Sequence, residues 1–129
     1  MQTSIEPGLT LTLEKIVLKE DTAARYGSGL IEVFATPAMV AFMEQTSLGV
    51  VQPGLPEGYN TVGIEISVKH IKASPVGMKV SCTALLERVE GKKLFFTLEA
   101  WDEEGKIGMG THTRYIINTE EFMKSLTRK

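Results

Sequence analysis

The chain has 129 residues, of which 43% are hydrophobic and 23% are charged, and its formal net charge is −2. This length and balance predict one globular domain, residues 1–129, with a sizeable core. The low charge argues against a nucleic-acid partner, and no apolar run approaches the roughly 20 residues that span a bilayer. The N-terminal residues lack the basic and apolar regions of a signal peptide. We therefore expect a cytoplasmic protein with neither a membrane nor a nucleic acid as partner.

The residue inventory limits the chemistry further. The single cysteine, Cys82, cannot form an internal disulfide and lies in an apolar strand pattern, so we expect it to pack inertly in the core. The two histidines have no metal-binding spacing, and the chain has no glycine-rich phosphate loop, CxxC, HExxH or GxSxG motif. We therefore expect the protein to have no metal site and no cofactor.

The first predicted element is a half-buried strand in which Leu9, Leu11 and Leu13 alternate with polar residues. The phase slips at Lys15, which predicts a bulge or a strand end. Residues 25–29, with two glycines, are expected to form a loop.

A helix is predicted after this loop. Thr36 and Pro37 form a start signal, because threonine can cap free backbone N–H groups and proline suits the first helical position. Residues 38–48 are apolar on nearly every side, which is typical of a buried helix, and Glu44 is their only charge.

Four strand-like segments follow, and residues 119–127 are expected to form a short terminal helix. The strands show alternating stripes: Val62, Ile64, Ile66, Val68 and His70; Val80, Cys82, Ala84 and Leu86; Leu94, Phe96, Leu98 and Ala100; Ile107, Met109, Thr111, Thr113, Tyr115 and Ile117. The order strand, helix, four strands predicts an α+β hot-dog fold, in which a mostly antiparallel sheet wraps one long apolar helix. A free sheet edge is commonly completed by a second subunit, so we expect a homodimer or a higher homo-oligomer.

Two residues stand out as candidates for chemistry. Glu44 is a carboxylate within an apolar helix, where it costs free energy unless it is paired, so it is either a reactive group or a buried polar link. His70 ends an apolar stripe and can move a proton near neutral pH, although a histidine at the edge of the core that bonds to a backbone carbonyl is the commoner explanation of such a position.

Thr36 is expected to be a helix N-cap, yet a hydroxyl at a helix N-terminus can also help to stabilise an oxyanion. It lies eight residues before Glu44, or about 12 Å along a helix, so the two side chains cannot touch directly.

Three further residues are candidates on two of the strands. Gly63 interrupts a strand, which indicates either a bulge or the close approach of a ligand. Arg114 is positioned to meet a phosphate of coenzyme A or a surface carboxylate. His112 is expected to be structural or exposed.

Several segments resemble the fluoroacetyl-CoA thioesterase family of hot-dog proteins. They are residues 32–44 (EVFATPAMVAFME), 68–70 (VKH), 73–77 (ASPVG), 89–94 (VEGKKL) and 107–114 (IGMGTHTR). The resemblance covers about residues 31–118, in matching order and spacing. It implies a metal-independent acyl-CoA hydrolase with Thr36, Glu44 and His70 as the catalytic residues. It also implies that Gly63 lies next to the acyl group, that Arg114 is the basic residue of the last strand, and that the site lies at a dimer interface.

One departure concerns acyl specificity. The fluoroacetyl-specific member has phenylalanines in the lid segment before the helix, whereas Tyr26 to Leu30 are glycine-rich here. We therefore expect a different small or medium acyl group. The alternatives are a non-catalytic module that binds acyl-CoA or an apolar acid, and a hot-dog dehydratase; the latter typically needs a histidine near the helix early in the chain, and both histidines here come later.

Overall fold

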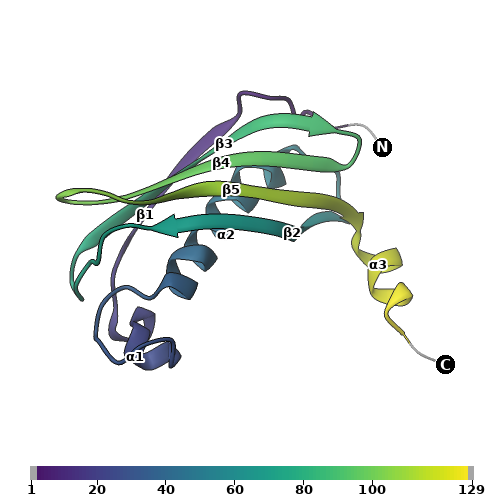
Figure 1. The fold of residues 1–129 in the computed structure, drawn as a ribbon. Coiled ribbons are helices and arrows are strands. Elements are labelled where there is room, and N and C mark those ends of the chain that lie inside the picture. The colour runs from purple at the N-terminus through teal and green to yellow at the C-terminus, as the bar shows by residue number, and fades with distance from the viewer. Residues whose placement is uncertain (1–2, 128–129) are drawn as a thin grey trace.

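The computed structural model describes residues 3–127 and contains one five-stranded antiparallel sheet that curves over a long helix (Figure 1). The strands are β1 (Thr10–Ile16), β2 (Tyr59–His70), β3 (Lys79–Glu90), β4 (Lys93–Asp102) and β5 (Gly105–Asn118). Their spatial order is β1-β3-β4-β5-β2, so β1 and β2 form the two edges. With α2 (Thr36–Val51) across the concave face, this architecture confirms the predicted hot-dog fold.

Short helical segments complete the described chain. They are η1 (Lys19–Asp21), α1 (Ala23–Tyr26), η2 (Gln52–Gly54) and α3 (Thr119–Ser125). Within residues 3–127, no helix is both long and apolar enough to cross a membrane. The predicted loop at residues 25–29 is partly helical, because the Thr22 hydroxyl accepts the Arg25 N–H to start α1, and Gly27 ends it with φ 74°.

The core lies between α2 and the inner faces of β3 and β4. The stripes predicted for these strands are confirmed: Val80, Cys82, Ala84, Leu86, Leu94, Phe96, Leu98 and Ala100 are all at most 2% exposed. They meet Met39, Phe42 and Met43 of α2, and each large apolar side chain buried there stabilises the fold by about 2 kcal/mol. Burial raises the pKa of the Cys82 thiol to about 11, which agrees with inert packing.

Of the two alternatives predicted at Lys15, the bulge is wrong, whereas the strand does end close by, at Ile16. β1 pairs with β3 in unbroken register from Thr10 to Ile16. The Lys15 side chain continues the inward-facing series of Leu11 and Leu13. It can do so because its ammonium reaches Asp21 at 2.9 Å and lies 5.9 Å from the centre of the Phe34 ring. A long apolar stem with a charged tip can therefore occupy a position that the pattern assigned to an apolar residue.

β2 contains an irregularity that the sequence pattern did not locate. Its register with β5 shifts between Gly63 and Glu65. Before this bulge, Thr61 and Gly63 face the helix; after it, the even-numbered residues through His70 do so, and Ile64 is 51% exposed. The uninterrupted stripe predicted for this strand is therefore wrong, since one extra residue reverses the phase.

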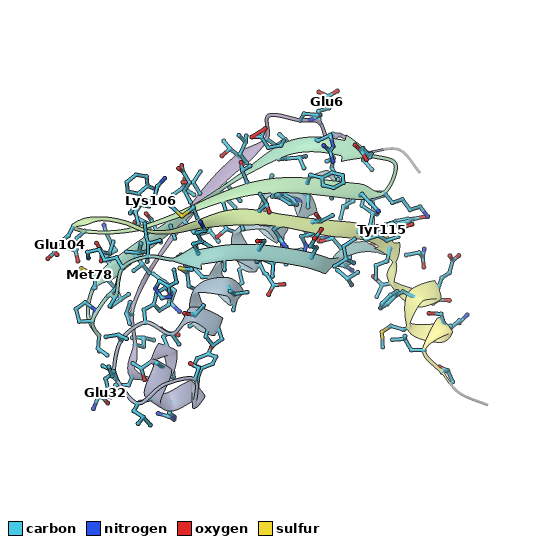
Figure 2. All side chains as sticks on the ribbon, viewed as in Figure 1. Glu6, Glu32, Met78, Glu104, Lys106 and Tyr115 are labelled. Carbon is cyan, nitrogen blue, oxygen red and sulfur yellow. The ribbon has the colours of Figure 1, made fainter. Side chains whose placement is uncertain are left out.

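β5 also differs from its predicted stripe. Its register with β4 shifts next to Trp101, and the side chains buried toward the helix are those of His112, Arg114 and Ile116. Lys106 and Tyr115 mark the two ends of this strand in Figure 2. The last strand thus places a histidine and an arginine in the interior.

Candidate active site

Thr36 and His70 form a hydrogen-bonded pair at the start of α2. Thr36 Oγ1 lies 2.9 Å from His70 Nδ1. Ala35, not Thr36, is the N-cap residue, and no side chain caps this helix. The predicted capping role of Thr36 is therefore wrong: the residue lies one position inside the helix, so its hydroxyl is available to the imidazole at the end of β2.

Burial affects the state of this imidazole. It lowers the pKa of His70 below the ordinary value of 6.5, and the backbone of Lys72 partly offsets the effect. His70 Nε2 is buried and makes no hydrogen bond of standard geometry to residues 3–127. At neutral pH His70 is therefore an uncharged ring, able to accept a proton.

Glu44 lies two turns further along α2, beside the β2 bulge. A Cβ atom built on Gly63 would be 2.9 Å from Glu44 Oε2 and 3.5 Å from Arg114 Nη1. The carboxylate thus occupies the space that a side chain at residue 63 would fill. Gly63 does not have a positive φ, so glycine is required here for space rather than for backbone conformation.

Arg114 and His112 form a buried polar network behind Glu44. Arg114 is 7% exposed, and its guanidinium donates to Thr61 Oγ1 at 2.7 Å and to the Thr61 carbonyl at 3.0 Å. Burial lowers the pKa of Arg114, and the Glu44 carboxylate partly offsets the effect. This burial favours an interior role for Arg114 over contact with a phosphate or a surface carboxylate.

The described chain therefore holds two separate groups of candidate residues. Thr36 and His70 lie at one end of the interface between α2 and β2, and Glu44 and Gly63 lie at the other. Seven residues separate Gly63 from His70, or about 23 Å of extended strand, and eight separate Thr36 from Glu44, or about 12 Å of helix. One chain thus does not bring the three predicted catalytic side chains together.

A cavity of about 360 Å³ opens beside the Thr36–His70 pair. Its wall comes from the segment before α2 and the segment after β2, and the residues are Ala23, Ser28, Val33, Phe34, Ala35, Thr36, His70, Ile71, Lys72 and Ala73. Small side chains dominate this lining. The space suits a compact, partly apolar group next to the Thr36 hydroxyl and the His70 ring.

Comparison with known proteins identifies the family. The model of the fluoroacetyl-CoA-specific thioesterase family matches residues 17–120. The chain belongs to this family. A fluoroacetyl-CoA thioesterase from Streptantibioticus cattleyicolor is 40% identical over 98 residues, which cover 76% of this chain and 70% of that protein. The predicted thioesterase class, a hydrolase, is thereby confirmed.

Solved structures agree with this family membership. A mutant of the fluoroacetyl-CoA-specific thioesterase in complex with fluoroacetate and CoA is 34% identical, with a TM-score of 0.87, and the match covers 92% of this chain and 99% of that one. A hot-dog-like protein from Thermanaerovibrio acidaminovorans is 27% identical, with a TM-score of 0.86, and the match covers 93% of this chain and 89% of that one.

Some residues in and around the candidate site carry no strong sequence signal. Thr61 faces inward only because the bulge reverses the phase of β2. Ser74 and Asp102 lie outside the predicted apolar stripes, yet both are buried and hydrogen-bonded to each other at 2.8 Å. His112 was expected to be structural or exposed, and it is buried; the polar pattern around it gave no sign of its contact with Arg114.

Proposed function

We propose that this protein hydrolyses acyl-CoA thioesters with a small or medium acyl group, without a metal, at a site shared by two copies of the chain. The observation that carries the proposal is the Thr36–His70 hydrogen bond at the mouth of a cavity, in a chain that belongs to a thioesterase family. CoA is present in a solved structure of a relative, which supports the same class of substrate here. The comparisons offer no support for a non-catalytic binding module.

The proposed mechanism assigns Glu44 the attack on the thioester. The carboxylate either takes a proton from water as the water oxygen bonds to the acyl carbon, or bonds to that carbon itself. The C–S bond then breaks and CoA leaves as a thiolate. In the first route, His70 relays to the thiolate the proton that Glu44 took from water. In the second route, water hydrolyses the anhydride formed on Glu44, which releases the acid and restores the carboxylate, and His70 passes a proton from that water to the thiolate. Thr36 orients the imidazole through its hydroxyl, and the Gly63 N–H holds the carbonyl oxygen as negative charge develops on it.

A second copy of the chain would unite the two groups of residues. β2 is an edge strand, and its free edge lies beside both groups. If two β2 strands pair antiparallel about a two-fold axis near Ser67, the Gly63 end of one meets the His70 end of the other. Glu44 of the partner subunit would then face the Thr36–His70 pair, and each dimer would hold two complete sites.

The cavity and the segment before α2 support an acyl group other than fluoroacetyl. Residues 27–30 contain two glycines and Leu30, which is 96% exposed, in the place of the phenylalanine lid. The small residues that line the cavity leave space for more than two carbons. We therefore propose that longer or branched acyl groups are better substrates than fluoroacetyl-CoA.

An acyl-CoA panel tests this function. Release of free CoA is measured for acetyl-, fluoroacetyl-, butyryl-, isovaleryl- and hexanoyl-CoA with the wild type, Glu44→Gln and His70→Ala. We expect hydrolysis by the wild type and a loss of about 100-fold or more in each variant. Full activity in both variants would show that the assignment is wrong, and binding without CoA release would favour the non-catalytic module.

A further inference from the structure

His112 is the central residue of the polar network behind Glu44. It is 2% exposed, and its ring packs near Phe96 of β4 with the centroids 6.1 Å apart. Its Nδ1 lies 2.7 Å from the Glu65 carbonyl oxygen, and its Nε2 lies 3.1 Å from Arg114 Nη1. A carbonyl oxygen only accepts and a guanidinium only donates, so Nδ1 carries the proton and Nε2 accepts. His112 is therefore neutral and held in the Nδ1–H tautomer.

Arg114 is fixed between two anchors. Thr61 accepts from Nε and Nη2, and His112 accepts from Nη1, so three of the five guanidinium N–H groups are bonded. The point at which a Cβ on Gly63 would lie is 2.9 Å from Glu44 Oε2, 3.1 Å from His112 Cε1 and 3.5 Å from Arg114 Nη1. The carboxylate, the imidazole and the guanidinium thus converge on the β2 bulge.

We propose that His112 is a positioning residue for Glu44. His112 holds the Arg114 guanidinium beside the Glu44 carboxylate and, through the Glu65 carbonyl, connects the guanidinium and the carboxylate to the bulge of β2. This inference rests on the acyl-CoA hydrolysis proposed above. By accepting from Nη1, His112 acts with Thr61 to fix the plane of the guanidinium and thus where its positive charge lies relative to the Glu44 carboxylate. Without His112 the guanidinium could tilt about its bonds to Thr61, and the carboxylate would follow the charge away from the thioester.

The surroundings of His112 keep it neutral for this role. The groups that face it are the Glu44 carboxylate from α2, the Glu65 carbonyl from β2, the Phe96 ring from β4 and Arg114 on its own strand. Burial lowers the pKa of His112 most, and the Arg114 charge lowers it further, while the Glu65 carbonyl and Glu44 act in the opposite direction. A protonated ring would place a second cation against the guanidinium.

Two substitutions separate hydrogen bonding from packing. His112→Phe keeps an aromatic ring beside Phe96 but removes both hydrogen bonds, and we expect kcat to fall about 10- to 100-fold with KM changed less than about threefold. His112→Gln offers an amide oxygen to Arg114 and should recover most of that kcat. Thr113→Val, the adjacent buried residue on the same strand, is the matched control and should keep wild-type turnover.

A double-mutant cycle tests whether His112 acts through Glu44. When His112→Phe is added to the Glu44→Gln variant, kcat should fall by less than about twofold relative to Glu44→Gln alone, because the carboxylate that His112 positions is already absent. Independent, multiplicative losses in the double variant would overturn the inference. So would wild-type kcat in His112→Phe alone.

A second readout does not depend on turnover. Because the chain has two histidines, 15N NMR of the wild type and of His70→Ala assigns their ring nitrogens. We expect His112 to be in the Nδ1–H tautomer at pH 7.5, as its bonds to the Glu65 carbonyl and to Arg114 require, and an Nε2–H tautomer or a ring that exchanges freely between the two tautomers would overturn the inference. A wild type that hydrolyses no acyl-CoA would contradict the proposed function, whereas normal turnover with an unaffected His112→Phe variant would contradict only the role of His112.

Discussion

The Thr36 hydroxyl is bonded to His70 rather than to the helix that it begins. A threonine that caps a helix contributes about 1 kcal/mol to stability, whereas one that lies inside the first turn contributes little through its hydroxyl. Its contribution to activity and its contribution to stability can therefore be separated by substitution.

We predict that Thr36→Val lowers acyl-CoA hydrolysis by about 100-fold and lowers the free energy of unfolding by less than about 1 kcal/mol. Valine keeps the shape of threonine and removes only the bond to His70. Thr36→Ser keeps the hydroxyl and should retain most of the activity. Steady-state kinetics and urea unfolding measure both effects; a large loss of stability with little loss of activity would instead indicate a cap.

Gly63 is a second position at which a single atom matters. We predict that Gly63→Ala lowers kcat by about 10-fold or more, because its Cβ would lie 2.9 Å from Glu44 Oε2 and must displace the carboxylate. Ile64→Ala, in the same bulge but 51% exposed, is the control and should remain active. Equal losses in the two variants would indicate general damage to the strand.

At the scale of elements, the segment after β2 is fixed by a buried carboxylate at the end of β4. The Asp102 side chain is 0% exposed and accepts from Lys72 Nζ at 2.6 Å, Ser74 Oγ at 2.8 Å and the Glu104 N–H at 2.8 Å. The Ser74 carbonyl in turn accepts the Phe34 N–H at 2.8 Å, two residues before Thr36. Asp102 thereby holds together the two segments that carry Thr36 and His70.

We predict that Asp102→Asn lowers the free energy of unfolding by about 2 kcal/mol at pH 7 and reduces activity several-fold. Burial alone would raise the pKa of Asp102, but its hydrogen bonds outweigh burial and lower the pKa below 3.8. The stabilisation is therefore present above pH 3.8 and is lost as the pH falls through the lowered pKa, so the variant should differ least from the wild type in acid.

Glu104→Gln is the control for this carboxylate. The Glu104 side chain, labelled at the tip of the β4–β5 turn in Figure 2, is 70% exposed and lies 3.7 Å from Lys72 Nζ. An exposed pair of this kind contributes little, so unfolding should be unchanged. Urea unfolding at pH 7 and pH 3 compares the two variants.

At the scale of the whole molecule, the separation of Glu44 from His70 makes the proposed site a property of two chains. We predict that Glu44→Gln and His70→Ala, each inactive alone, recover about a quarter of wild-type activity when they are mixed and allowed to exchange subunits. Half of the dimers are then mixed, and each mixed dimer has one intact site. Hydrolysis after refolding the mixture measures the recovery, and each variant refolded alone is the control. No recovery in a mixture shown to contain mixed dimers would place the site within one chain.

The alternating and helical patterns of apolar residues along the chain were sufficient to predict the architecture. The apolar stripes of β3 and β4 and the apolar length of α2 follow directly from which residues avoid water, and these alone indicate one helix wrapped by a sheet. The lone carboxylate at Glu44 and the histidine at the end of β2 were recognisable for the same reason, since polar groups are costly in such patterns.

Contacts between distant segments required the tertiary structure. Whether Thr36 caps α2 or bonds His70 depends on a shift of one residue at the start of the helix and on a partner 34 positions away. The bulge at Gly63 reverses the phase of β2 and turns Thr61 inward to meet Arg114, which no local pattern encodes. The sequence by itself determined which residues avoid water; only the tertiary structure decided which polar atoms meet, because hydrogen bonds depend on ångström-scale placement rather than on periodicity.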